Sequence, residues 1–177
     1  MKPGAKKNAK RTRRKDNRLY ALEVFIVSGP STEKFIEQNP VISRTIEIRG
    51  DQTLQDLHEA IFTAFDRYDE HLYEFQFGEG PHDPNGKRYV LALPMDFPFP
   101  EQDEPAGYVT DATIGSLGLK VDQAFGYWFD FGDDWWHQIN VVAIQDEAAR
   151  GKYPRVTKRV GESPPQYVDW DEEDEED

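Results

Sequence analysis

The sequence predicts an α+β domain in which an antiparallel sheet of about five or six strands packs against one main helix. Apolar segments of strand length recur along the chain, at 19–28, 42–49, 72–77, 124–131 and 135–144. Only residues 53–66 have the apolar spacing of a longer helix. Because parallel strands need long crossovers that are usually helical, a chain with one such helix favours antiparallel pairing.

The first two predicted strands differ in how they are covered. Residues 19–28 (LYALEVFIVS) are apolar on both faces apart from Glu23 and Ser28, which is typical of a strand buried on two sides. Residues 42–49 (ISRTIEIR) alternate instead, so their apolar face carries Ile42, Ile46 and Ile48. This second strand is therefore predicted to be half-buried.

The predicted helix begins with good capping residues. Thr53 suits the N-cap, and Asp56 places a negative charge in the first turn. The spacing of one apolar face is then followed by Leu54, Leu57, His58, Ile61 and Phe65. The face is continuous enough to predict that this helix covers the sheet.

The other segments are less regular. Residues 72–77 (LYEFQF) predict another strand. Residues 78–107 contain six prolines and four glycines, so most of this stretch is predicted to be irregular, with one strand at 87–93. Near the end of the chain, residues 153–166 predict a single short extended segment followed by a proline stop.

Charge is concentrated at the two ends of the chain. Residues 1–18 hold nine Lys or Arg and one Asp, a charge of +8, whereas residues 169–177 hold eight acids and no base, a charge of −8. The whole chain carries −13, so the body between the ends is acidic as well. Dense runs of like charge are usually disordered. We therefore predict a disordered basic arm (1–18), a single domain (19–168) and a disordered acidic tail (169–177).

The composition also bounds the class of protein. The sequence has no cysteine, which excludes disulfides, thiolate zinc sites and cysteine nucleophiles, and is compatible with a reducing compartment. No segment approaches the roughly 18 apolar residues that span a bilayer. Glu23 interrupts the apolar run that follows the basic arm, which argues against a signal peptide. We expect a cytoplasmic protein with no membrane association.

Three motifs together resemble a known family. They are T-L-Q-D-L-H-E-A-I-F-T-A-F (53–65), H-L-Y-E-F (71–75) and Y-W-F-D-F-G-D-D-W-W-H-Q-I-N-V (127–141). In this order they are similar to the plasmid pRiA4b (Ri-plasmid) ORF-three-like family, also described as an insertion-element passenger protein family. The likeness covers roughly residues 19–166. It implies one main helix against antiparallel strands and a setting in plasmid or mobile-element biology, and it implies no established activity.

The chain departs from the family pattern in several places. A tryptophan usual before H-L-x-x-F is absent, and Tyr68 could take its role. A glutamate common after the I-x-V of the second hairpin strand is Ala143 here. The C-terminal motif survives only as G-E-S-P-P-Q (161–166). The resolvase label given to some relatives finds no support here, because a serine recombinase would need a separate helical DNA-binding domain.

The segment F-D-F-G-D-D-W-W-H (129–137) carries the candidate catalytic residues. Its carboxylates Asp130, Asp133 and Asp134 lie close in sequence to His137, as an acid–base or metal site would require. Aspartate also supplies local hydrogen bonds in turns. A structural role in a hairpin turn is therefore favoured over a catalytic one.

Two registers of this hairpin follow from its turn chemistry. If residues 133–134 form the loop, Asp130 faces His137, and the pair would raise the histidine pKa. If residues 132–133 form a glycine-first turn, His137 faces Trp128 instead. The sequence leaves both registers open.

The histidines are the candidate metal ligands. His58, His71 and His137, with Asp130 or Glu74, would make a plausible zinc or iron set. Their spacing matches no local metal motif, and His58 lies on the apolar face of its helix, where a core histidine is the more ordinary interpretation. No cofactor is expected, and a divalent metal stays as the alternative.

The aromatic residues of the hairpin are candidates for ligand binding. The alternation predicts one core-facing set, namely Phe125, Tyr127, Phe129 and Phe131. Trp128, Trp135 and Trp136 cannot all share that face, so at least one is predicted near the surface, where it could serve a partner. These tryptophans are the weak ligand-binding candidates.

The leading functional hypothesis is a non-enzymatic interaction module of the plasmid ORF-three-like kind, with an unknown protein partner or nucleic acid bound through residues 1–18. The alternative is a metal-dependent hydrolase or nuclease using His58, His71, His137 and the aspartates Asp130, Asp133 and Asp134. The sequence determines neither the partner nor the oligomeric state.

Overall fold

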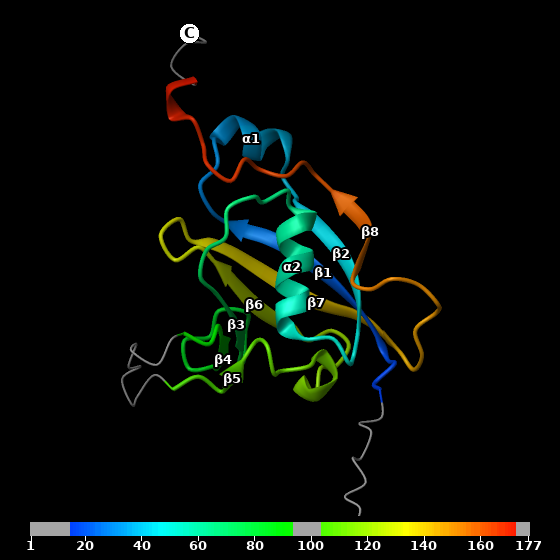
Figure 1. Ribbon diagram of the computed structural model, residues 1–177. Helices are drawn as coiled ribbons and strands as arrows, with labels where there is room; N and C mark the ends of the chain where they lie inside the picture. Colours follow the sequence, from blue (N-terminus) through cyan, green and yellow to red (C-terminus); the bar gives the residue numbers. More distant parts are fainter. Residues whose placement is uncertain (1–14, 94–103, 173–177) are drawn as a thin grey trace, which may run out of the picture.

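The backbone is built around one long, twisted sheet with a helix across one face (Figure 1). The structure is a computed structural model that describes residues 15–93 and 104–172. In the described residues the strands are β1 (Leu19–Ser28), β2 (Ser43–Arg49), β3 (Tyr73–Phe77), β4 (Lys87–Val90), β5 (Gly107–Tyr108), β6 (Ala124–Phe129), β7 (Trp135–Gln145) and β8 (Arg155–Val160). Their order in the sheet is β5-β4-β3-β6-β7-β1-β2-β8. All neighbours are antiparallel except β4 and β5, which are parallel.

The predicted fold class is wrong in the size and nature of the sheet. The described residues form a mostly β fold with eight strands in one mixed sheet, not five or six antiparallel strands against a main helix. β8 lies in the segment that was expected only to be extended, and its outward residues are largely exposed, so its apolar alternation is weak. β5 has two residues in a proline-rich stretch, too few to show any period.

The helices differ in how far the sequence reveals them. α2 (Leu54–Ala64) begins where it was predicted to begin, because Thr53 and Asp56 form a capping box in which each side chain accepts a hydrogen bond from the backbone of the other. α1 (Glu33–Gln38) was not predicted. It is capped by Thr32 but buries no residue, so it has no apolar face to give a periodic signal.

The core lies between α2 and the face of the sheet that it crosses. Leu54, Leu57 and Ile61 of the helix are buried against apolar side chains from the central strands. These include Tyr20, Leu22, Val24, Ile46, Ile48, Phe75, Phe125, Ile139 and Val141. The predicted apolar faces of β2 and α2 are therefore confirmed.

The two charged ends of the chain fall mostly outside the described residues. Of the predicted arm (1–18) only residues 15–18 are described, and of the predicted tail (169–177) only residues 169–172. The Asp16 and Arg18 carbonyls accept hydrogen bonds from the Asp51 and Gly50 amides, at 3.0 and 2.8 Å. Among the described helices, none combines the length and the apolar character needed to cross a bilayer.

Candidate functional site

The β6–β7 hairpin has a register that differs from both predicted ones. Tyr127 pairs with His137, Trp128 with Trp136, and Phe129 with Trp135, so the loop has five residues, 130–134. Asp130 therefore does not face His137. The two-residue loops were predicted from Asp and Gly alone, which did not reveal that both loop ends are left-handed.

The backbone conformation favours aspartate at both ends of this loop. Asp130 and Asp134 have φ of 60° and 57°, a left-handed conformation in which Asp is enriched among non-glycine residues. Asp130 also accepts hydrogen bonds through Oδ1 from the amides of Gly132 and Asp133, at 3.0 and 3.2 Å. Asp134 accepts one from the indole nitrogen of Trp128 at 2.9 Å. Two of the three candidate catalytic carboxylates thus stabilise the hairpin itself.

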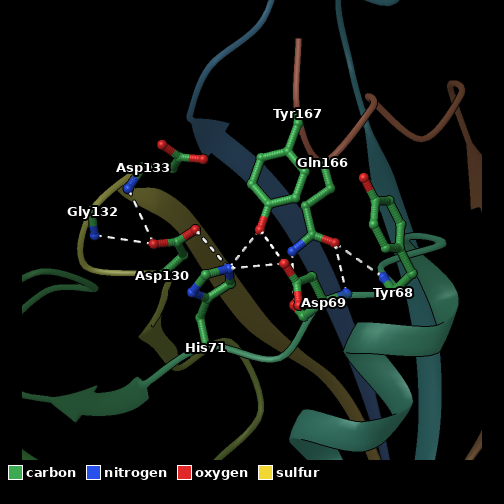
Figure 2. A network of polar contacts seen from close by, with 8 residues as sticks. All are labelled: Tyr68, Asp69, His71, Asp130, Gly132, Asp133, Gln166 and Tyr167. Atoms are coloured by element: carbon green, nitrogen blue, oxygen red, sulfur yellow. Dashed lines mark hydrogen bonds and ion pairs between the residues drawn. The ribbon is translucent and has the colours of Figure 1, made fainter.

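Asp130 contacts a different histidine from the one predicted (Figure 2). Its Oδ2 lies 3.4 Å from Nε2 of His71, which precedes β3, and its side chain is buried. The same Nε2 lies 2.7 Å from the hydroxyl of Tyr167. That hydroxyl donates to Oδ2 of Asp69 at 2.6 Å, and this hydrogen bond raises the pKa of Tyr167 to about 12. The tyrosine oxygen is then left to accept a hydrogen bond from Nε2–H of His71.

The C-terminal segment is attached to the same place through Gln166. Its amide oxygen accepts hydrogen bonds from the backbone of Tyr68 and Asp69 at 3.0 and 3.1 Å, and its amide nitrogen donates to the Asp69 carbonyl at 2.7 Å. Figure 2 shows these bonds beside the His71 and Tyr167 contacts. The loop after α2, the hairpin loop and the chain after β8 therefore meet in one polar network.

His137 is part of the core. It is almost fully buried, and Nδ1 donates to the backbone carbonyls of Tyr127 and Trp135, at 3.3 and 3.1 Å. Burial lowers the pKa of His137 to about 3, with the nearby Arg67 charge acting in the same direction. The rise in this pKa that was expected for a loop at residues 133–134 does not occur, because that register does not form and Asp130 does not face His137.

His58 is also buried, and both of its ring nitrogens are bonded. The Tyr127 hydroxyl donates to Nδ1 at 2.6 Å, and Nε2 lies 3.0 Å from a carboxylate oxygen of Glu70. Burial lowers the pKa of His58 to about 3, so the ring is neutral and Nε2–H donates to Glu70. The ring stacks on Tyr73 with centroids 3.6 Å apart.

The three histidines surround the same aromatic cluster without forming a common ligand set. His58 and His71 each lie near the ring of Phe129, and His137 lies near Tyr127. Within the described ranges, no group of three His, Asp or Glu side chains is placed to hold a metal ion. Of these candidates, only His71 lies next to one of the candidate aspartates, Asp130.

The three candidate tryptophans fall on opposite faces of the hairpin. Trp135 is fully buried on the core face, beside Gly29, where a Cβ would collide with the indole ring at 2.1 Å. Trp128 and Trp136 lie on the other face and stack with centroids 4.6 Å apart and planes 6° apart. Phe131 was predicted in the core but lies beyond the end of β6. It is 41% exposed, and its ring centre lies 4.1 Å from that of Trp128.

A fourth aromatic residue completes a row on this outer face. His82, in the turn between β3 and β4, packs edge-on against Trp136 with ring centres 4.7 Å apart. We call His82, Trp136, Trp128 and Phe131 the aromatic row. Strand alternation could predict the two tryptophans, whereas His82 and Phe131 reach the row from loops and leave no periodic signal.

Several residues of the polar network were also missed. Asp69 lies 97 and 98 positions before Gln166 and Tyr167, and all three come from irregular segments. The only sequence signal was the motif G-E-S-P-P-Q, whose last residue is Gln166. The hydrogen bonds of the network hold the segment after β8 against the loop after α2.

Comparison with known proteins places the chain in a family. The family described as "Plasmid pRiA4b ORF-3-like protein" matches residues 34–170, most of the chain. The chain belongs to this family. This confirms the resemblance carried by the helix, H-L-Y-E-F and hairpin motifs. Membership in the pRiA4b ORF-3-like family brings no established enzymatic or binding activity.

Two comparisons of this pRiA4b ORF-3-like chain with individual proteins extend this finding. The "Uncharacterized protein y4hQ" of Sinorhizobium fredii (strain NBRC 101917 / NGR234) is 24% identical over 132 residues, which are 73% of this chain and 60% of that protein. The chain thus spans less than two thirds of that relative. The crystal structure of the protein of unknown function MM3350 from Methanosarcina mazei Go1 has a TM-score of 0.61 at 22% identity. It covers 84% of this chain and 72% of that one. This second likeness establishes a shared fold.

Proposed function

We propose that this pRiA4b ORF-3-like protein is a non-enzymatic interaction module that binds single-stranded nucleic acid in the cytoplasm, in a plasmid or mobile-element setting. The basic residues of 1–18 would hold phosphates, and the aromatic row would contact bases. The observation that supports this most is the row itself. It is an aromatic surface on the sheet face away from α2, and both of its ends, His82 and Phe131, are exposed.

The use of the polar signature residues favours binding over catalysis. Asp130 and Asp134 accept hydrogen bonds from the hairpin, and His137 donates to backbone carbonyls inside the core. A general base must reach a substrate proton, which a nearly fully buried and neutral His137 does not do. No observation among the described residues specifically favours the metal-dependent hydrolase or nuclease.

The charges explain which kind of nucleic-acid binding is expected. The acidic body repels phosphate, and Asp134 bonds to Trp128 of the row, so attraction depends on the basic arm. Binding through the arm is driven by counterion release and falls steeply with salt. The acidic residues 169–177 can compete for the same arm within one molecule, at an effective concentration that reaches roughly millimolar. The intact protein should therefore bind weakly and without sequence preference.

Fluorescence anisotropy with a labelled single strand tests the contribution of the row. Phe131→Ala should weaken binding about 5- to 150-fold, because stacking on one aromatic ring contributes about 1–3 kcal/mol per base. Val142→Ala is the matched control, since Val142 is another exposed apolar side chain, on β7 beyond the row. Equal affinities of the two variants would remove the row from the proposal.

A further inference from the structure

A pocket opens between α2 and β3 on the face of the sheet opposite the aromatic row. It has a volume of about 510 Å³, within the range of small-molecule sites. His58 and Tyr73, stacked on each other, lie deep in it, and both side chains are buried. The lining also includes the apolar Leu72 and Leu91 and two exposed carboxylates, Glu59 and Glu70.

The charge of this pocket is negative. Among the described residues that line it, none is Lys or Arg. His71, which also lines it, has its Nε2 beside Asp130, Asp69 and the Tyr167 hydroxyl. His58 contributes no positive charge, because its ring is neutral and both nitrogens are occupied by Tyr127 and Glu70. The hydrogen bond from His58 also orients the Glu70 carboxylate at the pocket edge. Glu59 and Glu70 therefore present two negative charges to whatever enters.

Tyr73, which lines the same pocket, carries a buried hydroxyl without a partner among the described residues. Tyr73 is 3% exposed, and within the described chain its hydroxyl has no hydrogen-bond partner. Buried polar groups are nearly always paired, so such a group points to an absent ligand or water. Burial raises the pKa of Tyr73, and the charges of Glu70 and Glu59 add to the rise. The phenol oxygen can accept a hydrogen bond from a donor held by the two glutamates.

We propose that this pocket binds a small organic ammonium cation, of the size and charge of an aliphatic diamine. Its N–H groups would donate to Glu59, Glu70 and the Tyr73 oxygen, and its methylene groups would contact Leu72 and Leu91. An organic cation is favoured over a metal ion because no three-ligand group is found in the described part of the chain. This inference does not depend on nucleic-acid binding, since the pocket and the aromatic row lie on opposite faces.

Isothermal titration of 1,4-diaminobutane into the full chain at low salt tests the proposal. A saturable one-to-one heat is expected, and 1,4-butanediol, which has the same length without charge, should give none. Glu59→Gln and Glu70→Gln should each weaken binding about two- to fivefold, the range of solvent-accessible ion pairs. Tyr73→Phe should weaken it about two- to tenfold, the range of one hydrogen bond.

Two controls separate a built site from general attraction to an acidic surface. Glu37→Gln, on α1 away from the pocket, changes the net charge as much as Glu70→Gln does and should leave the affinity unchanged. Without ligand, Tyr73→Phe should not lower the melting temperature, because the hydroxyl that it removes has no partner. The proposal is overturned by an absence of heat, by equal weakening in Glu37→Gln, or by Mg²⁺ or Zn²⁺ binding where the diamine does not.

Discussion

The guanidinium carbon of Arg67 lies 3.9 Å from the ring centre of Trp135, and both side chains are buried. Within the described residues, both terminal nitrogens of Arg67 and the indole nitrogen of Trp135 lack a hydrogen-bond partner. Burial lowers the pKa of Arg67 to about 10, so the side chain is still charged at neutral pH. The arginine is thus a buried cation whose described contact is an aromatic face, with no carboxylate in hydrogen-bonding range.

Arg67→Met should therefore leave the free energy of unfolding unchanged or raise it by about 1 kcal/mol. A buried charge without a paired anion costs desolvation, and an apolar side chain of similar length removes that cost. The loss of the cation–π contact offsets part of the gain. Urea denaturation at pH 7 measures the difference. A loss above about 2 kcal/mol would mean that the guanidinium has a strong partner, such as a bound anion.

Gln166→Ala should lower the free energy of unfolding by about 1–3 kcal/mol, because it leaves the amides of Tyr68 and Asp69 without their acceptor. Tyr167→Phe is the natural comparison. The Tyr167 hydroxyl bonds to the partly exposed Asp69 and His71. Tyr167→Phe should therefore lower the free energy of unfolding by less than Gln166→Ala does. Thermal unfolding of both variants checks the order, and the reverse order would show that the hydroxyl contacts matter more.

The sequence predicted the long strand and the helix well, and it predicted poorly the hairpin register and the contacts between distant segments. β1 and α2 were predicted with nearly their observed bounds, because a continuous apolar run and a capped apolar face are local signals. The hairpin register depended on the left-handed Asp130 and Asp134, which a count of loop residues does not reveal. The contact of His71 with Tyr167 joins residues 96 positions apart, and no local pattern carries such information.

His137 should make the stability pH-dependent. Its pKa in the folded state is about 3, below the ordinary value of 6.5, so between these values the unfolded chain binds more protons. The contribution of His137 to the free energy of unfolding is fully present above pH 6.5 and is lost as the pH falls towards 3. His137→Gln should be destabilised at pH 7, and the difference from the parent protein should shrink by about 2 kcal/mol at pH 5. Denaturant curves at both pH values measure this, and a constant difference would contradict the neutral, buried ring.

Phe129→Ala and Phe131→Ala should differ sharply in stability, although the two residues lie two positions apart. Phe129 is 1% exposed and packs among core rings, so its truncation should cost about 3–5 kcal/mol. Phe131 lies on the outer face, and its truncation should cost less than about 1 kcal/mol. Similar losses in the two variants would show that the hairpin faces are assigned wrongly.

The most direct test of the proposed binding function compares three proteins at two salt concentrations. They are the intact chain, a variant lacking 1–14, and a variant lacking 173–177, titrated against one labelled single strand. The first cut leaves Asp16 and Arg18, which bond to the domain, in place. The intact chain should bind weakly and lose affinity with salt, with a log–log slope of up to about −0.7 per phosphate contacted. Removal of 173–177 should tighten binding and removal of 1–14 should abolish it, whereas equally poor binding by all three at low salt would contradict the nucleic-acid link.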